Sequence, residues 1–252
     1  MLIDYISDIH INHWNRLFNK HGGTTTREFF QNHFEFPLDD YPEPMKVAVV
    51  AGDNGDGGKY WSIIRGALLE IGYSEVIVIK GNHDFYGEKY DDDTVYTTTI
   101  DGVRFACAPL WTNFWSNPLH GWDAQRAISD FHYIKSLTDP RDRDYQNPCN
   151  IMTRWHEKEV EFLKKAEADV IVSHFPPFLE CIQDVYKGDK YNPYFVNDLD
   201  PADFPTVKTW IHGHTHHPQE NQVGHINVVS NPVGYPGENF KKPRFRMAQV
   251  EV

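Results

Sequence analysis

The sequence predicts a layered α/β protein in which helices cover β-sheets. Short β-branched runs that end at polar residues predict buried strands, and stretches with apolar residues at helical spacing predict amphipathic helices. The chain has 252 residues, of which 40% are apolar and 24% charged, as in ordinary globular proteins. This length suits one large domain with a sizeable core.

The predicted strands and helices alternate early in the chain, and strands dominate later. We expect strands at 2–6, 46–51 and 75–80, and a helix at 58–71 with Gly72 as its C-cap. An Asp-Gly turn between strands at 94–100 and 103–108 predicts a β-hairpin. A helix at 152–166, with Thr153 as a candidate N-cap, precedes strands expected at 169–172, 207–211, 226–230 and 245–250.

Three stretches are predicted to be insertions into a single domain that spans residues 1–252. They lie near residues 12–44, 111–150 and 175–205. The first has a weak helical pattern at 27–33, and the second is rich in aromatic residues from Trp111 to Tyr133. Loops of this length usually carry function in a compact domain. We interpret the aromatic residues as a small lid core, with base stacking as the alternative.

Composition narrows the partners and the compartment. The net charge of -12 argues against a broad basic face for long duplex nucleic acid. The three cysteines form no C-x-x-C pair, which favours a reducing compartment such as the cytoplasm. The N-terminal run contains Asp4 and Asp8 and does not resemble a signal peptide, and no apolar run is long enough for a membrane helix. We therefore expect a cytoplasmic protein without a membrane partner.

Polar motifs follow the first two predicted strands. Asp8 and His10 are two residues apart, so both side chains can project to one side of an extended chain and reach one metal ion. Gly52 permits a sharp turn before Asp53, whose two carboxylate oxygens can bridge two cations. Taken alone, the first motif is a common chance pairing, and the second is better explained as a plain Gly-Asp turn.

The motif Gly81-Asn82-His83-Asp84 follows the third predicted strand and is more specific. Asn82 offers a neutral carbonyl oxygen as a metal ligand, and His83 can transfer a proton. Asp84 is expected to orient or polarise the His83 imidazole. A surface turn is the weaker alternative, because the motif comes directly after a buried-type strand at 75–80.

Histidines follow two of the later strands. His174 stands alone after the strand at 169–172, and a lone histidine is more often structural than a ligand. His214 and His216 share the i, i+2 spacing, and Gly213 permits a close approach of the backbone. Metal binding is the leading interpretation of this pair, whereas the flanking histidines are expected to be orienting or surface residues.

The order of these five motifs resembles the calcineurin-like metallophosphoesterase superfamily. The resemblance spans residues 4 to about 230 and is specific only at the motifs. It implies a four-layer α-β-β-α sandwich of two mixed sheets flanked by helices. It also implies two divalent metal ions, one held by Asp8, His10, Asp53 and His216 and the other by Asp53, Asn82, His174 and His214. Asp53 would bridge the ions together with a water or hydroxide, and Asp56 would support the turn or the ligands.

The chemistry of this ligand set suits hydrolysis of a phosphoester. Two divalent ions, the carboxylates of Asp8 and Asp53 and a bridging hydroxide leave a net charge of roughly +1, which attracts an anionic ester. The two metals activate the bridging hydroxide, and His83 is the candidate general acid for the leaving oxygen. Nitrogen and oxygen ligands without thiolate favour Mn, Fe, Zn, Co or Ni over Ca, and we expect Mn2+.

A small phosphodiester, with a nucleotide as one candidate, is the predicted substrate. Protein-phosphatase relatives usually place arginines beside their metal motifs, and no arginine adjoins the Gly-Asp or Gly-Asn-His motif here. A serine/threonine protein phosphatase or another phosphomonoesterase is the alternative, because a fold does not fix its substrate. A non-catalytic scaffold of the same fold is a third hypothesis, and the completeness of the motifs argues against it.

Overall fold

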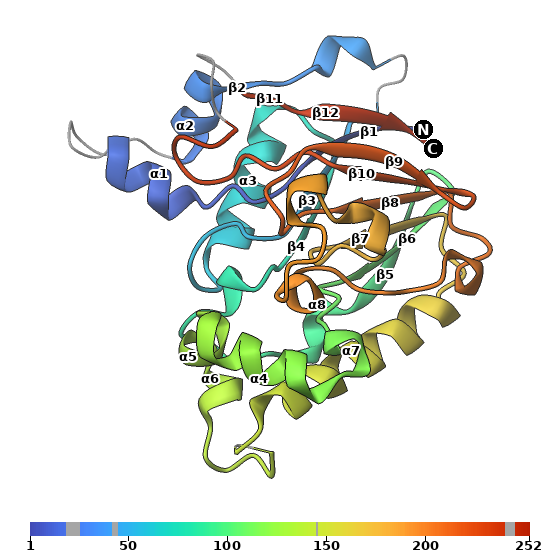
Figure 1. The fold of residues 1–252 in the computed structure, drawn as a ribbon. Coiled ribbons are helices and arrows are strands. Elements are labelled where there is room, and N and C mark those ends of the chain that lie inside the picture. The colour runs from blue at the N-terminus through green and yellow to red at the C-terminus, as the bar shows by residue number, and fades with distance from the viewer. Residues whose placement is uncertain (19–25, 42–44, 145, 240–244) are drawn as a thin grey trace.

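The computed structural model describes residues 1–18, 26–41, 45–144, 146–239 and 245–252. Two large mixed β-sheets pack face to face, and helices lie over their outer faces (Figure 1). The predicted four-layer α/β fold class is therefore confirmed.

The smaller of these sheets has the strand order β12-β1-β3-β4. Its strands are β1 (Leu2–Ile6), β3 (Val47–Ala51), β4 (Glu75–Ile79) and β12 (Ala248–Glu251). β1, β3 and β4 are parallel, and β12 runs antiparallel to β1. Every residue of β3 is buried, as expected for a β-branched strand that is covered on both faces. The pairing of β1 with β12 places the N- and C-terminal residues side by side (Figure 1).

The larger sheet has the strand order β5-β6-β7-β8-β10-β9. Its strands are β5 (Tyr96–Ile100), β6 (Val103–Ala108), β7 (Val170–Ser173), β8 (Thr209–His212), β9 (Gln219–Val223) and β10 (Ile226–Ser230). The inner four are parallel, whereas β5 and β9 run antiparallel to their neighbours. β9 was not predicted, because its sequence QENQV is polar and only Val223 is buried. A short pair, β2 (Phe34–Glu35) and β11 (Phe245–Arg246), lies apart from both sheets.

Three apolar clusters separate the four layers. Ile3, Val49, Phe105 and Val172 belong to the cluster between the sheets. Helices α1 (Ile11–Phe18), α2 (Thr26–His33) and α3 (Tyr60–Ile71) contribute to the cluster outside the smaller sheet. The cluster outside the larger sheet includes apolar residues of α7 (Pro148–Lys165), which lies along that sheet in Figure 1. Each sheet is thus buried on both faces, which explains the near-continuous apolar runs of its inner strands.

Of the two longer predicted helices, α3 ends where expected, whereas α7 begins earlier than expected. α3 ends at Ile71 with Gly72 as its C-cap, as predicted. The φ of 130° at Gly72 suits glycine, and its N–H donates to the carbonyls of Leu68 and Leu69. α7 begins at Pro148, so Thr153 lies inside the helix and is not its N-cap. A proline at the first helical position has no N–H to leave unsatisfied, and this signal was missed in the sequence.

The three predicted insertions contain mainly short helices. The first holds α1, α2, β2 and η2 (Leu38–Asp40), and its residues 19–25 and 42–44 lie outside the described residues, as does Tyr145 in the second. The second holds η5 (Phe114–Ser116), α4 (Pro118–Ala127), α5 (Asp130–Tyr133), α6 (Lys135–Thr138) and the start of α7. The third holds η6 (Leu179–Cys181), η7 (Asp184–Tyr186), α8 (Asn192–Phe195) and η8 (Pro201–Asp203). α4 and α8 contact each other, which brings the second and third segments together (Figure 1).

The aromatic residues of segment 111–150 divide into core and surface. Trp111 and Phe131 are buried in the cluster outside the larger sheet, whereas Trp122 and Tyr133 are exposed.

Within the described part of the chain, no helix is both long and apolar enough to cross a membrane.

Candidate active site

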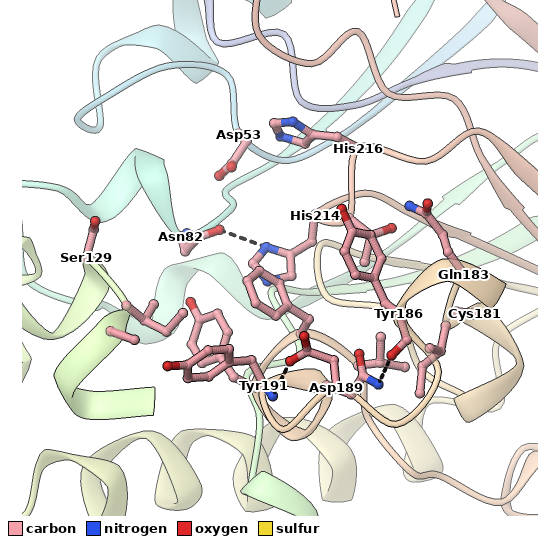
Figure 2. A pocket seen from close by; sticks show the side chains of 18 of the residues that line it. Asp53, Asn82, Ser129, Cys181, Gln183, Tyr186, Asp189, Tyr191, His214 and His216 are labelled. Atoms are coloured by element: carbon pink, nitrogen blue, oxygen red, sulfur yellow. Dashed lines mark hydrogen bonds between the residues drawn. The ribbon is translucent and has the colours of Figure 1, made fainter. Parts of the chain in front are cut away.

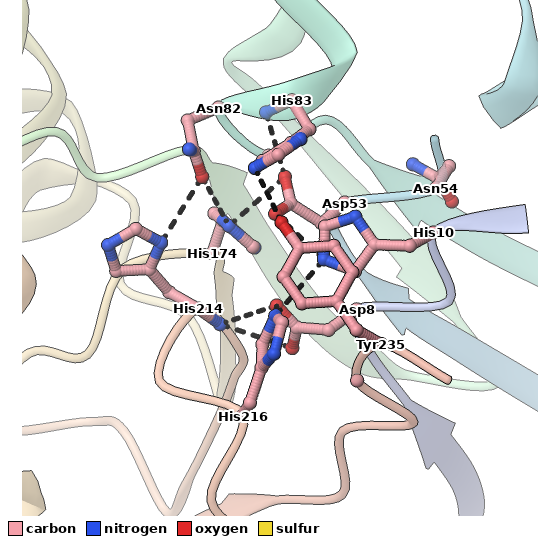
Figure 3. A network of polar contacts seen from close by, with 12 residues as sticks. Asp8, His10, Asp53, Asn54, Asn82, His83, His174, His214, His216 and Tyr235 are labelled. Atoms are coloured by element: carbon pink, nitrogen blue, oxygen red, sulfur yellow. Dashed lines mark hydrogen bonds and ion pairs between the residues drawn. The ribbon is translucent and has the colours of Figure 1, made fainter. Parts of the chain in front are cut away.

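The five polar motifs meet at one edge of the sandwich. Asp8, Asp53 and Asn82 follow β1, β3 and β4, whose parallel pairing brings their carboxyl ends to the same edge. His174 and His214 follow the parallel strands β7 and β8 of the facing sheet. Figure 3 shows these side chains converging from the two sheets. This is the edge where ligands bind in parallel sheets.

Several motif residues have a backbone conformation that is rare for residues other than glycine. The left-handed φ angles are 52° at Asp8, 44° at His10, 53° at Asp53, 72° at His214 and 50° at His216. Such conformations persist only where the surroundings hold them, and they cluster at functional sites. Here the Asp8 N–H donates to the Gly52 carbonyl at 3.0 Å, and the His10 N–H donates to the Asp53 carbonyl at 2.9 Å. The turns after β1 and β3 therefore hold each other in place.

Glycines beside the motifs permit the close approach of these turns. A Cβ atom on Gly52 would lie 2.5 Å from His174 Nδ1, and one on Gly213 would lie 2.6 Å from Asp8 Oδ2. A Cβ atom on Gly81 would lie 2.5 Å from the backbone nitrogen of Asp53. Real Cβ atoms essentially never approach other atoms so closely, so each position excludes a side chain.

Substitution of Gly81 tests this requirement. Gly81→Ala should lower the free energy of unfolding by about 1–3 kcal/mol, because the added methyl group must displace the turn that carries Asp53. Gly66→Ala in α3 is the matched control: its Cβ meets no atom within 4 Å, and alanine should stabilise the helix by up to about 1 kcal/mol. Urea titration measures both variants. Equal stability of Gly81→Ala and the wild type would contradict the close packing.

One group of potential metal ligands surrounds the turns after β1 and β3. Asp8, His10, Asp53 and His216 each offer one atom that lies within 4.8 Å of the others. His10 Nε2 lies 3.0 Å from His216 Nε2 and 3.5 Å from Asp53 Oδ2. His216 Nε2 lies 3.5 Å from Asp8 Oδ1. Two imidazole nitrogens that face each other beside two buried carboxylates fit a shared divalent cation.

A second group of donors lies around Asn82. The Asn82 carbonyl oxygen is 2.9 Å from His174 Nε2 and 3.2 Å from His214 Nδ1. His174 Nε2 is also 3.3 Å from Asp53 Oδ1. The two carboxylate oxygens of Asp53 thus face different groups, Oδ2 toward His10 and Oδ1 toward His174. The residue set therefore fits two cations that share one carboxylate.

Hydrogen bonds fix the ring orientation of two of these histidines. His174 Nδ1 donates to the Ala51 carbonyl at 2.9 Å, and His216 Nδ1 donates to Glu238 Oε2 at 2.7 Å. In both rings the Nε2 atom then faces the other candidate metal ligands. Histidines that bind metals commonly show this arrangement, because the outer hydrogen bond holds the ring and raises its basicity.

Buried carboxylates keep two of the histidines protonated in the metal-free protein. Burial lowers the pKa of His174, but the charge and hydrogen bond of Asp53 outweigh it and raise the pKa to about 9. Burial likewise opposes protonation of His216, whose contacts with Asp8 and Glu238 raise its pKa to about 9. The pKa of His10 falls to about 3, mainly because the ring is buried. Near neutral pH, His174 and His216 are therefore cations that offset the carboxylates.

Metal binding should consequently release protons. A histidine must lose its ring proton to bind a metal, so Mn2+ should displace up to two protons, from His174 and His216. The apparent affinity for Mn2+ should rise with pH and level off above about 9, where both rings are already neutral. Calorimetric titration in buffers of different ionisation enthalpy counts the released protons. Binding without proton release near pH 7 would contradict the histidine assignment.

His83 has a carboxylate partner, but it is not the one expected. His83 Nδ1 lies 2.8 Å from Asp56 Oδ1, and its Nε2 lies 3.2 Å from the Tyr235 hydroxyl. Burial lowers the pKa of His83, but the charges of Asp53, Asp56 and Asp130 and the bond to Asp56 outweigh it, so the pKa is raised. The ring thus has a fixed orientation and a strengthened hold on its proton.

The expectation that Asp84 orients His83 is wrong. Asp84 Oδ2 accepts hydrogen bonds from the Gly81 N–H at 2.9 Å and from the backbone and side-chain nitrogens of Asn54 at 3.2 and 3.1 Å. Burial, together with the charge of Asp53, raises the pKa of Asp84 to about 7. His83 and Asp84 are neighbours in the short turn η3 (His83–Phe85), and their side chains take different partners. Asp84 therefore holds the turn, and Asp56 orients His83.

Three further residues at the site carried no signal in the sequence: Asp130, Tyr235 and Glu238. The ring of Tyr235 stacks on His10 with a centroid distance of 4.4 Å and an interplanar angle of 27°. Glu238 holds His216, and Asp130 bonds to the Asn82 side chain at 3.0 Å. Their positions depend on the path of loops far from the motifs in sequence.

A cavity of about 510 Å³ opens beside the donor groups (Figure 2). Its lining includes five residues of the polar motifs: Asp53, Asn82, His83, His214 and His216. The segments 111–150 and 175–205 supply much of the remaining wall, including Ser129, Gln183, Tyr186, Tyr191, Tyr194 and Phe195. Of the described residues that line the cavity, none is Lys or Arg, and Asp189 and Glu238 are acidic.

Comparison with known proteins places this geometry in a family. The profile of the family described as calcineurin-like phosphoesterase matches residues 1–218. The phosphopantetheinyl hydrolase of Mycobacterium tuberculosis is similar in structure, with a TM-score of 0.62 and 17% identity over 98% of this chain and 95% of that chain. A dimetal phosphatase from Danio rerio has a TM-score of 0.48 and 13% identity over 93% of this chain and 88% of that chain. None of the curated proteins matches the chain.

At 17% identity the similarity to the phosphopantetheinyl hydrolase is evidence of the fold alone, whereas the family match covers most of the chain and includes all five motifs. Members of this family act on phosphoesters at dinuclear divalent metal centres, and a candidate metal site is present here. The chain therefore belongs to the calcineurin-like phosphoesterase family and is a phosphoester hydrolase.

Proposed function

We propose that the protein is a phosphodiesterase that hydrolyses a small diester, with a nucleotide as one candidate, and that it uses two Mn2+ ions. The ions would be held by the two sets Asp8, His10, Asp53, His216 and Asp53, Asn82, His174, His214. The two oxygens of Asp53 support this assignment, because they lie 3.5 Å from His10 Nε2 and 3.3 Å from His174 Nε2. Bound ions would supply the Lewis acidity and the activated water that ester hydrolysis needs.

The charge of the cavity is the observation that favours a diester over a monoester. The lining residues in the described chain include neither Lys nor Arg, whereas Asp189 and Glu238 add negative charge. A phosphomonoester carries a charge of about -1.5 to -2 at pH 7. A diester carries a single negative charge and keeps a neutral ester group on each side of it. A cavity whose positive charge would come only from its metal ions and from the proton of His83 matches the diester better.

The size and lining of the cavity support a substrate of nucleotide type. Its volume of about 510 Å³ is typical of small-molecule sites. Tyr186, Tyr191 and Phe195 offer aromatic faces on which a base can stack, and the Gln183 amide and Ser129 hydroxyl offer hydrogen bonds. Trp111 and Phe131 are packed in the core and do not line the cavity, so any stacking falls to the third segment or to Tyr235.

His83 is proposed to protonate the leaving oxygen. Its Nδ1 faces Asp56 at 2.8 Å, and this contact turns Nε2 toward Tyr235 and the cavity that both residues line. A general acid must lie within hydrogen-bond reach of the oxygen that it protonates, and the cavity position of His83 meets that need. Asp56 would hold the ring in the orientation that presents its proton to the substrate.

Two broader proposals accompany this function. We propose that residues 1–252 form a single domain, since an apolar cluster lies between each pair of adjacent layers in the described residues. We also propose a reducing compartment, the cytoplasm, because Cys107, Cys149 and Cys181 are free and buried.

A substrate panel tests the proposed function. Mn2+-loaded protein would be assayed with a bis-aryl phosphate, a cyclic nucleotide, a dinucleotide, a phosphopantetheinyl ester, an aryl monophosphate and a phosphopeptide. We expect kcat/KM for at least one diester to exceed that of the monoesters by at least about tenfold, or roughly 1.4 kcal/mol in the transition state. Preference for the aryl monophosphate or the phosphopeptide would replace the diester with the phosphatase alternative. No turnover from protein with both metals bound would favour the scaffold.

A further inference from the structure

We propose that Asp130 is a positioning residue, which fixes the Asn82 amide toward the second metal position and joins that ligand to the walls of the cavity. This inference rests on the proposed two-metal function. Asp130 lies in α5, within the second of the predicted insertions, and is 1% exposed. Its Oδ1 accepts hydrogen bonds from Asn82 Nδ2 at 3.0 Å and from the Tyr86 hydroxyl at 2.8 Å. The Tyr194 hydroxyl donates to its Oδ2.

The carboxylate decides which end of the Asn82 amide faces the metal position. A carboxylate only accepts hydrogen bonds, so the NH2 group of Asn82 must point at Asp130. The Asn82 carbonyl oxygen then points the other way, toward His174 Nε2 and His214 Nδ1 (Figure 3). An amide turned by half a rotation would offer its NH2 group, which cannot bind a cation. Asp130 therefore selects the one orientation in which Asn82 is a ligand.

The same carboxylate joins parts of the site that lie far apart in sequence. Tyr194 belongs to α8 in the third segment and lines the cavity, as does Ser129 beside Asp130. The Tyr86 ring lies against His83, with a centroid distance of 4.3 Å. The Asp130 carboxylate thus contacts the proposed metal ligand Asn82 and the Tyr86 side chain that packs against His83. It also contacts Tyr194, which joins the second segment to the cavity wall formed by the third. Figure 2 shows Asn82 between Ser129 and His214, which also line this cavity.

Removal of the Asp130 carboxylate should lower the metal affinity of one position and leave the affinity of the other unchanged. Loss of a hydrogen-bond partner behind a metal ligand typically lowers metal affinity about 10- to 100-fold. Asp130→Ala should show this loss at the position that includes Asn82, while the position of His10 and His216 keeps its affinity. Asp130→Asn keeps the shape and one acceptor oxygen but removes the charge, so a smaller loss is expected.

Titration of the metal-free 252-residue chain with Mn2+ tests the proposal. The wild type should bind two ions, and Asp130→Ala should bind one as tightly and the other about 10- to 100-fold more weakly. Asp123→Asn is the matched control, because this carboxylate lies in the same segment but its side chain is 46% exposed. Its ion pair is with Lys190 at 3.9 Å and not with a residue of the proposed metal site. It should bind both ions as the wild type does. Excess Mn2+ should also restore turnover in Asp130→Ala but not in His83→Ala.

The outcomes separate the possible failures. Wild-type affinity for both ions in Asp130→Ala, even with a lowered melting temperature, would reduce Asp130 to a structural role and overturn the proposal. Should Asp130→Ala fail to fold, Asp130→Asn carries the test, with weakened binding at one position expected and unchanged binding contradicting it. A wild type that binds fewer than two ions would instead overturn the proposed function itself, and the role of Asp130 with it.

Discussion

Asp53→Asn should lose both metal ions and at least about a thousandfold of turnover, because two-metal catalysis contributes several kcal/mol to the transition state. Asp53 faces both groups of donors, with Oδ2 toward His10 and Oδ1 toward His174. Its Oδ1 also accepts the His83 N–H at 2.9 Å. An asparagine keeps the shape but replaces one oxygen by an NH2 group, which cannot bind a cation. It also removes one negative charge from between the two positions.

Metal content after dialysis and kcat/KM measure this effect together. Asp101→Asn is the matched control, because Asp101 lies in the exposed β5–β6 turn and asparagine also tolerates its φ of 47°. The control should keep two ions and full activity. Retention of both ions by Asp53→Asn, with wild-type turnover, would show that this carboxylate does not bridge the two positions.

His83→Ala should keep both ions and still lose about 10²- to 10⁴-fold in kcat on a diester with an alkyl leaving group. Such a leaving oxygen needs a proton, and His83 lines the cavity beside Asp53 without belonging to either proposed set of metal ligands. With a nitrophenolate leaving group, which needs little protonation, the loss should be much smaller. The ratio of the two losses separates proton transfer from damage to the metal site.

Asp56→Asn should reproduce part of this loss, because Asp56 Oδ1 is the carboxylate oxygen 2.8 Å from His83 Nδ1. The double variant should be little worse than His83→Ala alone, since residues that act as a unit are not additive. Asp84→Asn tests the carboxylate that was expected to orient His83. It should affect folding stability more than the ratio of the activity losses on the alkyl and nitrophenyl diesters, because Asp84 bonds to Gly81 and Asn54. Full activity of His83→Ala on the alkyl diester would contradict the assigned role.

The sequence predicted the layers and the position of the site well because both depend on local patterns. Buried parallel strands read as β-branched runs, and a motif at the end of each run must lie at one edge of its sheet. The strands at 2–6 and 226–230 have the predicted limits. β9 was missed because an edge strand such as QENQV needs few apolar residues.

The partners of individual side chains were harder to predict. Asp84 is the nearest carboxylate to His83 in sequence, but Asp56 is 27 positions away and is the one in contact. Asp130 lies in an α-helical turn of four residues, and no local pattern marks its contact with Asn82, 48 positions away. Such contacts depend on how segments 111–150 and 175–205 fold over the sheet edge, which periodicity does not specify.

Anomalous diffraction from crystals grown with Mn2+ tests the central claim most directly. Two peaks should appear roughly 3.5–4 Å apart, one on each side of the Asp53 carboxylate. His10 and His216 should contact one peak, and His174, His214 and Asn82 should contact the other. A single peak, or peaks that Asp53 does not touch, would contradict the two-metal account of this site.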